Sequence, residues 1–309
     1  MKYDWGSINI RRLMGESWSQ IAPDYNVSAS TLRKAASRRK GEFEENGGLR
    51  ILLIDIETAP NTAYVWGLWK QNVAPNQIVQ TGRVMCFAAM WYTPGGSVPV
   101  GFFSEHNMPH ETMIRTAWDL LDQADAIVHY NGSRFDVPTL NREFVKLGLT
   151  PPRPYHQIDL LKVVRQQFRF ASNRLEHILA ELRIGEKGQN EGFTLWVKCM
   201  DANHPEHNRA WEVMENYNRK DVTEMVSLYE TLRPWIDNHP NHALYTDTDR
   251  PVCPNCGNTH MVKKGLAHTK TQTYQQYRCS GTNGCGRWVR ERFTVVDKEK
   301  RRHIMAPVK

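Results

Sequence analysis

Five side chains carry oxygen atoms that could hold divalent metal ions and a water molecule. They are Asp55 and Glu57 in ILLIDIET, Asp136 in HYNGSRFD, and Tyr217 and Asp221 in YNRKD. Carboxylates are the hard oxygen ligands that Mg²⁺ and Mn²⁺ prefer, and a phenol can hold a water by a hydrogen bond. Such a set suits two-metal hydrolysis of a phosphodiester. The three segments are far apart in the sequence, so the fold must bring them together.

The first pair of carboxylates follows the apolar residues 51–54, which predict a buried strand over 50–56. Residues two apart on a strand point to the same face, so Asp55 and Glu57 are expected side by side. Charges at the end of a buried strand are costly unless they are paired or bound to metal. Taken alone, the pattern would more simply indicate two carboxylates that are exposed to solvent at the end of a strand.

Asp136 follows a second strand-like run, residues 126–130, and the turn residues Asn131-Gly132-Ser133. Apolar residues at helical spacing predict a helix over 137–147. Asp136 therefore stands near a helix N-terminus, where capping of the helix is the simpler alternative to catalysis.

The third segment lies in a long helix expected over 209–232. Tyr217 and Asp221 are four residues apart, so they are expected on one helical face. Individually they could be a surface tyrosine and a solvated aspartate. The presence of all three segments in this order favours a metal-dependent nuclease.

Together these motifs resemble the DEDD superfamily of 3′–5′ exonucleases, which are DnaQ-like nucleases with a ribonuclease H-like fold. The matching segments are Asp55-x-Glu57, Asn131 to Asp136, and Tyr217-x3-Asp221, and the tyrosine is similar to that of the DEDDy branch. The resemblance covers residues 49–235. A narrower similarity to exonucleases of bacteriophages rests on Trp66 to Trp69 and on Arg233 to Asn241.

The resemblance implies how the site would work. Asp55 would bridge two Mg²⁺ or Mn²⁺ ions, Glu57 and Asp221 would bind the ion that activates water, and Asp136 would act mainly through water on the other. Tyr217 would orient the attacking water, since a phenol with a pKa of about 10 is a poor base at neutral pH. Cleavage from a 3′ end with release of mononucleotides is also implied, as is contact of the nucleic acid with Asn131.

The expected fold class is α/β, a ribonuclease H-like mixed sheet flanked by helices, with a small all-α helix-turn-helix before it and a β zinc ribbon after it. The sheet order comes from the resemblance. The patterns themselves predict strands near 50–56, 84–91, 98–103 and 126–130, and helices near 111–122, 137–147, 174–183 and 209–232. The expected divisions are a helix-turn-helix at 1–40, a linker at 41–48, the exonuclease domain at 49–235, a linker at 236–250, the zinc ribbon at 251–295 and a basic tail at 296–309.

The N-terminal segment has the pattern of three short helices, the last of them basic. It resembles a helix-turn-helix in which the buried residues are Ile21, Ala22, Val27 and Leu32. The last helix would then bind nucleic acid through Arg33, Lys34 and Arg38. A small module for protein contacts is the alternative, because short three-helix units serve that purpose too.

The C-terminal segment contains two cysteine pairs, Cys253 with Cys256 and Cys279 with Cys285. Four thiolates in two pairs are typical of one structural Zn²⁺, and the intervening segments at 262–264 and 272–277 have the pattern of hairpin strands. The five-residue gap within the second pair departs from the usual two. Lysines, arginines and aromatic residues alternate here, which suits single-stranded nucleic acid. The residues expected to contact it include Lys263, Lys264, Arg287, Trp288 and Arg290. The simpler alternative is that the rings form a small core.

Charge is distributed unevenly along the chain. Residues 1–50 carry 9 basic and 6 acidic residues, residues 51–240 carry 18 and 22, and residues 241–309 carry 13 and 5. The core is therefore mildly acidic, and its flanks are suited to a polyanion. The sequence has no long apolar run and no signal-peptide core, which predicts a soluble cytoplasmic protein, in the host cytoplasm if it is encoded by a phage.

Nucleic acid is the expected partner, and the N-terminal pattern favours DNA over RNA. The alternatives are an RNA-trimming exonuclease of the same superfamily, a DNA-binding regulator with an inert core, and an adaptor among replication or recombination proteins that docks through Trp66 to Trp69. His204 and His207 have no third ligand nearby in the sequence and are interpreted as loop residues. The pattern gives no indication of oligomeric state.

Overall fold

The structure is a computed structural model that describes residue 8 and residues 18–32, 34–35, 48–94, 99–185, 192–306 and 308. Arg33 and Arg38, with most of the first predicted helix, lie outside the described residues. The chain divides into two compact units, one including Arg50–Tyr229 and the other including Glu230–Lys309.

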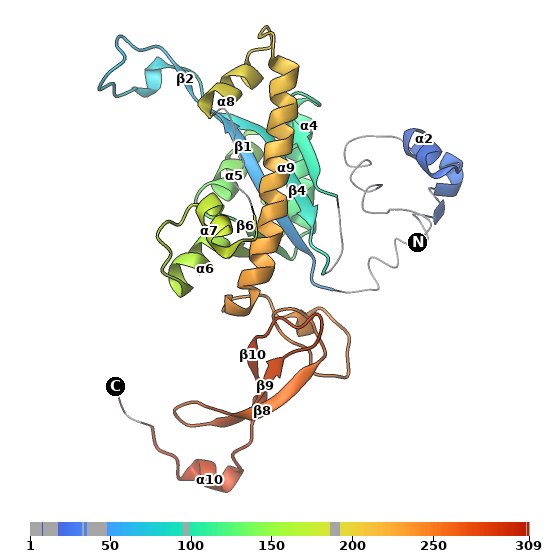
Figure 1. The fold of residues 1–309 in the computed structure, drawn as a ribbon, viewed down its shortest axis with the longest axis vertical. Helices are drawn as coiled ribbons and strands as arrows, with labels where there is room; N and C mark the ends of the chain where they lie inside the picture. Colours follow the sequence, from blue (N-terminus) through green and yellow to red (C-terminus); the bar gives the residue numbers. More distant parts are fainter. Residues whose placement is uncertain are drawn as a thin grey trace. The chain divides into compact units, whose positions relative to one another are not determined.

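A five-stranded sheet forms the centre of the first unit (Figure 1). In spatial order its strands are β5 (Gly101–Ser104), β4 (Arg83–Trp91), β1 (Ile51–Ala59), β6 (Ala126–His129) and β7 (His156–Asp159). The first three strands are antiparallel to one another, whereas β6 is parallel to β1 and β7 is parallel to β6. This is the mixed sheet that was predicted, with β7 as a strand that the sequence patterns did not reveal.

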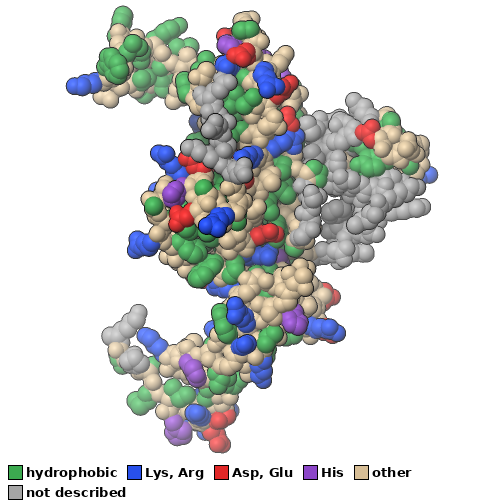
Figure 2. All heavy atoms as spheres, in the orientation of Figure 1, with side chains coloured by type: hydrophobic (Ala, Val, Ile, Leu, Met, Phe, Trp, Pro, Cys, Tyr) green, Lys and Arg blue, Asp and Glu red, His purple; other side chains and the backbone are tan. Residues whose placement is uncertain are grey.

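An arm, defined as residues 60–82, leaves the sheet between β1 and β4. It contains β2 (Thr62–Ala63), η2 (Pro75–Gln77) and β3 (Ile78–Gln80), and β2 pairs with β3. Figure 1 shows the arm extending away from the sheet, and Figure 2 shows hydrophobic side chains along it. The sequence pattern did not predict these strands because they are too short to carry a period-two alternation.

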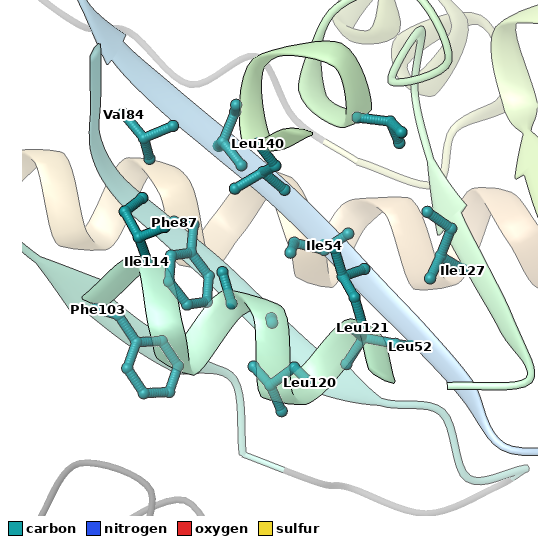
Figure 3. Close-up of a cluster of buried hydrophobic side chains, with 14 of the residues drawn as sticks. Leu52, Ile54, Val84, Phe87, Phe103, Ile114, Leu120, Leu121, Ile127 and Leu140 are labelled. Carbon is teal, nitrogen blue, oxygen red and sulfur yellow. The ribbon is translucent and has the colours of Figure 1, made fainter. Parts of the chain in front are cut away.

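Helices cover both faces of the sheet. On one face lie α4 (His110–Gln123) and α5 (Asp136–Lys146), and against the other lies α9 (His207–Leu232) (Figures 1 and 3). These helices and α7 (Leu175–Leu182) were predicted to within a few residues. The short helices α6 (Leu160–Gln167) and α8 (Phe193–Met200) were not. The interpretation of His207 as a loop residue is wrong, because α9 begins at that residue.

Alternation along β1 decides which face each side chain meets. Leu52, Ile54 and Ile56 are buried in one cluster with residues of α4 and α5, including Ile114, Leu121 and Leu140 (Figure 3). Asp55 and Glu57 occupy the intervening positions and therefore project to the opposite face, where α9 lies. The strand also continues to Ala59, three residues beyond its predicted end, with an irregularity in its pairing after Glu57.

The described N-terminal residues form a small apolar cluster of their own. Helical segments there are α2 (Trp18–Ile21), η1 (Ala22–Tyr25), and residues 29–32 and 34–35. The cluster contains all four residues predicted to be its buried centre, with Val27 only partly buried. Lys34 is exposed. Burial of these residues is what a helix-turn-helix requires, and binding of nucleic acid by this segment stays a prediction.

The second unit contains an antiparallel sheet of three strands, β8 (Met261–His268), β9 (Thr273–Cys279) and β10 (Trp288–Thr294), in the order β10-β9-β8. The first two are the strands that were predicted, and β10 is additional. Shorter elements are η3 (Arg233–Trp235), η4 (His242–Leu244) and α10 (Lys298–Arg302). No helix within the described part of the chain is long and apolar enough to cross a membrane.

Candidate functional site

The three sequence motifs meet at β1. Oxygen atoms of Asp55, Glu57 and Asp221 lie within 4.8 Å of one another. Asp136 is the first residue of α5, and its Oδ1 accepts a hydrogen bond from the backbone N–H of Ile56 at 3.2 Å. The N-cap position belongs to Phe135, with no side-chain capping bond. Asp136 is thus turned toward the strand that carries the other carboxylates.

Burial and mutual repulsion make this carboxylate cluster electrostatically strained. Burial above all, then the charges of Asp136, Glu57 and Asp221, hold the pKa of Asp55 well above its usual value. Burial followed by the charge of Asp221 raises the pKa of Glu57 to about 8. Burial is also the main reason why the pKa values of Asp136 and Asp221 rise to about 6. Either protons or a cation must relieve the repulsion, and an all-oxygen set fits Mg²⁺ or Mn²⁺.

Tyr217 stands one helical turn before Asp221, and its hydroxyl donates a hydrogen bond to that carboxylate. Burial and the neighbouring charges of Asp221 and Glu57 raise its pKa, so the side chain remains a phenol at neutral pH. The ring of Trp196, from α8, meets it edge-to-face with centroids 6.2 Å apart. Tyr217 is therefore fixed by packing as a hydrogen-bonding group rather than as a base.

Asn218 supports the cluster, although the sequence reasoning did not identify it. Its Nδ2 donates to Asp55 Oδ2 at 2.7 Å and lies 3.3 Å from the Asp55 carbonyl oxygen, and the residue is fully buried. This contact fixes α9 against β1 and holds Asp55 in one orientation. A spacing of three residues from Asp221 places both on one helical face, which is the signal that could have revealed it.

The turn before α5 is fixed by buried neighbours. Asn131 has a left-handed backbone with φ of 67°, and its N–H donates to Asp159 Oδ1 at 3.0 Å. The same oxygen caps α6 through the N–H of Leu161. A Cβ on Gly132 would lie 2.5 Å from the ring of the buried His129, so the turn needs glycine there. These contacts set the position from which α5 and Asp136 begin.

A hollow of about 230 Å³ lies beside the residues that follow Glu57 on β1 and the residue that precedes Asp136. One wall comes from the end of β1 and the root of the arm, and the other from the residue before Asp136 and from α5. The lining residues are Thr58, Ala59, Pro60, Asn61, Gly82, Phe135, Thr139 and Arg142. Thr58 follows Glu57 directly, and Phe135 precedes Asp136. The hollow offers the half-exposed ring of Phe135, whereas the guanidinium of Arg142 is already bonded to Glu143 and to the carbonyl oxygen of Gly82.

The four C-terminal cysteines converge as a second candidate metal centre. Their sulfur atoms lie within 4.8 Å of one another, with Sγ–Sγ distances of 3.6 Å for Cys253–Cys285 and for Cys256–Cys279. All six cysteines of the chain are free thiols. Four sulfurs bound tetrahedrally at 2.3 Å would lie about 3.8 Å apart, whereas a disulfide is about 2.05 Å long. The spacing therefore fits Zn²⁺ and excludes disulfides.

The same backbone turn follows both cysteine pairs, although different numbers of residues separate the two cysteines in each pair. A glycine with positive φ follows the second cysteine of each pair, Gly257 at 72° and Gly286 at 79°. Such backbone favours glycine, because a side chain would be strained. The longer loop of the second pair closes through a hydrogen bond from the N–H of Gly284 to the carbonyl of Gly281. The wider gap thus does not prevent convergence.

The residues predicted to contact nucleic acid in this unit have different surroundings. Lys263 and Lys264 are exposed on β8. Arg290 lies over the ring of Tyr274, with 3.8 Å between its Cζ and the ring centroid, and Trp288 is half exposed. Arg287 donates to Asp237 Oδ1 at 2.7 Å and to the Pro234 carbonyl oxygen. Its guanidinium is thus already used within the protein, unlike those lysines.

Comparisons with known proteins give a family and a similar solved structure. No curated protein sequence matches this chain. A solved structure that is similar to it is the family B DNA polymerase from the hyperthermophilic archaeon Pyrobaculum calidifontis, at 18% sequence identity and a TM-score of 0.44. The match covers 60% of this chain and 25% of the polymerase, so the chain corresponds to about a quarter of that protein's length. A family model matches residues 52–233, and the chain belongs to the RNase H superfamily.

Proposed function

We propose that the protein is a metal-dependent 3′–5′ exonuclease that hydrolyses phosphodiester bonds of nucleic acid, with DNA favoured. The observation that carries this proposal is the convergence of Asp55, Glu57 and Asp221 within 4.8 Å, with Asp136 bonded to the same strand. Membership of a superfamily of hydrolytic nucleases supports the reaction class. The 3′ polarity rests on the resemblance of the three motifs to those of the DEDDy exonucleases.

The carboxylates would hold two Mg²⁺ or Mn²⁺ ions. Asp55, Glu57 and Asp221 would bind one ion, and Asp55 would bind the other, on which Asp136 would act mainly through water. When bound, the ions would polarise the phosphodiester and lower the pKa of a water molecule. Repulsion among the ionised carboxylates supports this assignment, because each cation would remove an unfavourable interaction that the protein otherwise carries.

The remaining residues of the site would position the reactants. Tyr217 would orient the attacking water by a hydrogen bond, which suits a phenol whose pKa is raised. Asn218 would keep Asp55 aligned through the bond of 2.7 Å. We place the terminal nucleotide close to the hollow beside Thr58 and Phe135, where the ring of Phe135 could stack on a base.

The flanking segments would bind nucleic acid and stabilise the fold. The four cysteines would hold one structural Zn²⁺, which cross-links the strands of a zinc ribbon, and its exposed lysines would contact phosphates. The N-terminal segment would be a helix-turn-helix, and it is the feature that favours DNA. An RNA-trimming exonuclease is the second candidate, because the carboxylate cluster itself does not discriminate between the two polymers.

The test is cleavage of 5′-labelled single-stranded and duplex DNA and RNA with Mg²⁺, with Mn²⁺ or with a chelator. We expect metal-dependent shortening of the labelled strand one nucleotide at a time. Tyr217→Phe should reduce the rate less than Asp55→Asn, since the metal ligands remain. Glu212→Gln, on an exposed part of α9, is the control carboxylate. Release of the labelled nucleotide first, internal cuts, or full activity of Asp55→Asn would overturn the proposal.

A further inference from the structure

The arm exposes an unusual concentration of large apolar side chains. Trp66 is fully exposed, and Tyr64, Leu68 and Trp69 are each more than three-quarters exposed. Figure 2 shows hydrophobic side chains gathered on the arm, with a basic but no acidic side chain on the visible face. Soluble proteins rarely leave such a patch bare unless it binds something.

Hydrogen bonds within the arm fold it as a hairpin. Its root is closed by a hydrogen bond from the N–H of Gly82 to Asn61 Oδ1 at 2.6 Å. Further out, the backbone N–H of Tyr64 donates to the carbonyl oxygen of Gln77, and Gln77 Nε2 donates to the carbonyl oxygen of Tyr64, both at 3.0 Å. A Cβ on Gly82 would lie 2.7 Å from the carbonyl oxygen of Ala59, so the narrow root needs glycine. The exposed rings are thus presented by a folded hairpin.

The root of the arm directly follows the strand that carries Asp55 and Glu57. Thr58, Asn61 and Gly82 line the hollow, and Thr58 directly follows Glu57. A strand whose end lies in that hollow is therefore in contact with the root of the arm. The first exposed ring, that of Tyr64, directly follows β2, which begins next to that root.

The composition of the arm suits a polyanion with exposed bases. Residues 60–82 contain one charged residue, Lys70, and no carboxylate, so nothing on the arm repels phosphate. Indole and phenol rings offer flat faces on which unpaired bases stack, whatever the base. Low charge and aromatic residues also occur at protein interfaces. The shared wall with the hollow is what favours nucleic acid over a protein partner.

We propose that the arm is a stacking surface for unpaired bases of the nucleic acid strand whose end enters the carboxylate site. Trp66 and Trp69 supply the rings, and Lys70 supplies a cation for the adjoining phosphates. This inference rests on the proposed function and adds to it that the enzyme acts on a single-stranded or frayed end. A fully paired blunt end offers no free base faces and gains little from the arm.

The test measures binding rather than cleavage, in the Asp55→Asn background so that the strand is not consumed. Fluorescence anisotropy gives Kd for a labelled single strand of DNA or RNA, for an abasic strand of equal length, and for a blunt duplex. Replacing both Trp66 and Trp69 by Leu keeps the arm apolar but removes the rings, whereas replacing both by Phe keeps a stacking face. Thermal unfolding of each variant checks that the fold is retained.

We expect the Leu pair to raise Kd for single strands about tenfold or more, since a stacked base contributes about 1–3 kcal/mol. The variant with the Phe pair should keep a Kd near that of the parent protein, and all variants should bind the abasic strand with similar Kd values. Equal Kd values for parent and Leu pair on the single strand would overturn the inference and leave a protein as the partner of the arm. Loss of binding to the abasic strand as well would also contradict it. If the parent protein cleaves nothing but the ring dependence holds, the proposed exonuclease function fails while the inference stands.

Discussion

The two candidate metal centres of this chain are built in opposite ways. The cysteine centre is assembled from two short turns, each closed by a glycine, and its four sulfurs lie within 4.8 Å of one another. The carboxylate centre is assembled from β1, α5 and α9, and burial together with like charge raises the pKa values of all four acids. A closed set of thiolates stabilises a fold, whereas an open set of repelling carboxylates is suited to binding ions and substrate at the expense of stability.

The largest effect should come from removing one thiolate. Cys279→Ala leaves three ligands for zinc, and because metal binding and folding are coupled in such small units, the C-terminal sheet should lose its structure. Elemental analysis should find about one zinc per chain in the unaltered protein and much less zinc in the variant. Hydrogen exchange should show loss of protection over β8–β10 and retained protection in β1 and β4. Unchanged protection of β8–β10 would mean that the sulfur cluster is not a structural centre.

Removing one carboxylate should have the opposite effect on stability. Asp55→Asn should lower hydrolysis about a thousandfold or more, because the residue proposed to bind both ions is lost. The same change removes one of four repelling charges, so the metal-free variant should unfold at a higher temperature than the metal-free parent. Thermal unfolding in chelator measures this, with Glu212→Gln as the control. A clear fall in the unfolding temperature would contradict the account of the site as electrostatically strained.

The repulsion among the carboxylates should also make the stability of the metal-free protein depend on pH. Glu57 has a folded pKa of about 8, above its unfolded value, so the folded state binds more protons and stability falls as pH rises through that pKa. Without metal, the free energy of unfolding should drop by about 1 kcal/mol per pH unit per retained proton between pH 6.5 and 8.5. Burial lowers the pKa values of His129 and His239 to about 4, which acts in the opposite sense only at lower pH.

Saturating Mg²⁺ should flatten that slope, because the bound cations stabilise the ionised carboxylates. Denaturant titrations across this pH window, with Mg²⁺ or with chelator, measure it. The slope should also be smaller in Glu57→Gln. Stability that rises with pH in the metal-free protein would show that the carboxylates are not repelling one another.

A smaller effect is expected from the residue that orients Asp55. Asn218→Ala should weaken the apparent affinity for Mn²⁺ about tenfold, as is usual when the hydrogen-bonded partner of a metal ligand is lost. Activity should recover at high Mn²⁺, which a catalytic role for Asn218 would not allow. Asn216→Ala, on the exposed side of α9, is the matched control. Equal Mn²⁺ affinity in both variants would show that Asn218 does not orient Asp55 for metal binding.

The smallest effect concerns the surface near the cysteine centre. Charge reversal of Lys263, Lys264 and Arg290 should raise Kd for nucleic acid and reduce the log–log salt slope by up to about 2, since fewer phosphates are neutralised. The matched control reverses Lys298, Lys300 and Arg302 in α10, which changes net charge equally. If both sets change the slope alike, net charge rather than this sheet surface controls binding.

Much of this organisation could be predicted from local rules. Alternation along a strand places Asp55 beside Glu57, helical spacing places Tyr217 over Asp221, and paired cysteines predict convergence within a short segment. These are relations between residues close in sequence, where backbone geometry alone decides direction. The long helices α4, α5 and α9 and four of the five strands of the central sheet were identified for the same reason, whereas β7, α6 and α8 were not predicted.

The sequence by itself therefore determined which chemical groups are present and which way each turns within its own strand or helix. Only the tertiary structure decided that Asp136 bonds to the strand of Asp55, that Asn218 aligns Asp55, and that Arg287 is bound to Asp237. It also decided that the rings of the arm are exposed rather than buried. These outcomes depend on contacts between segments distant in sequence, and such contacts follow from packing of the whole core rather than from any local period.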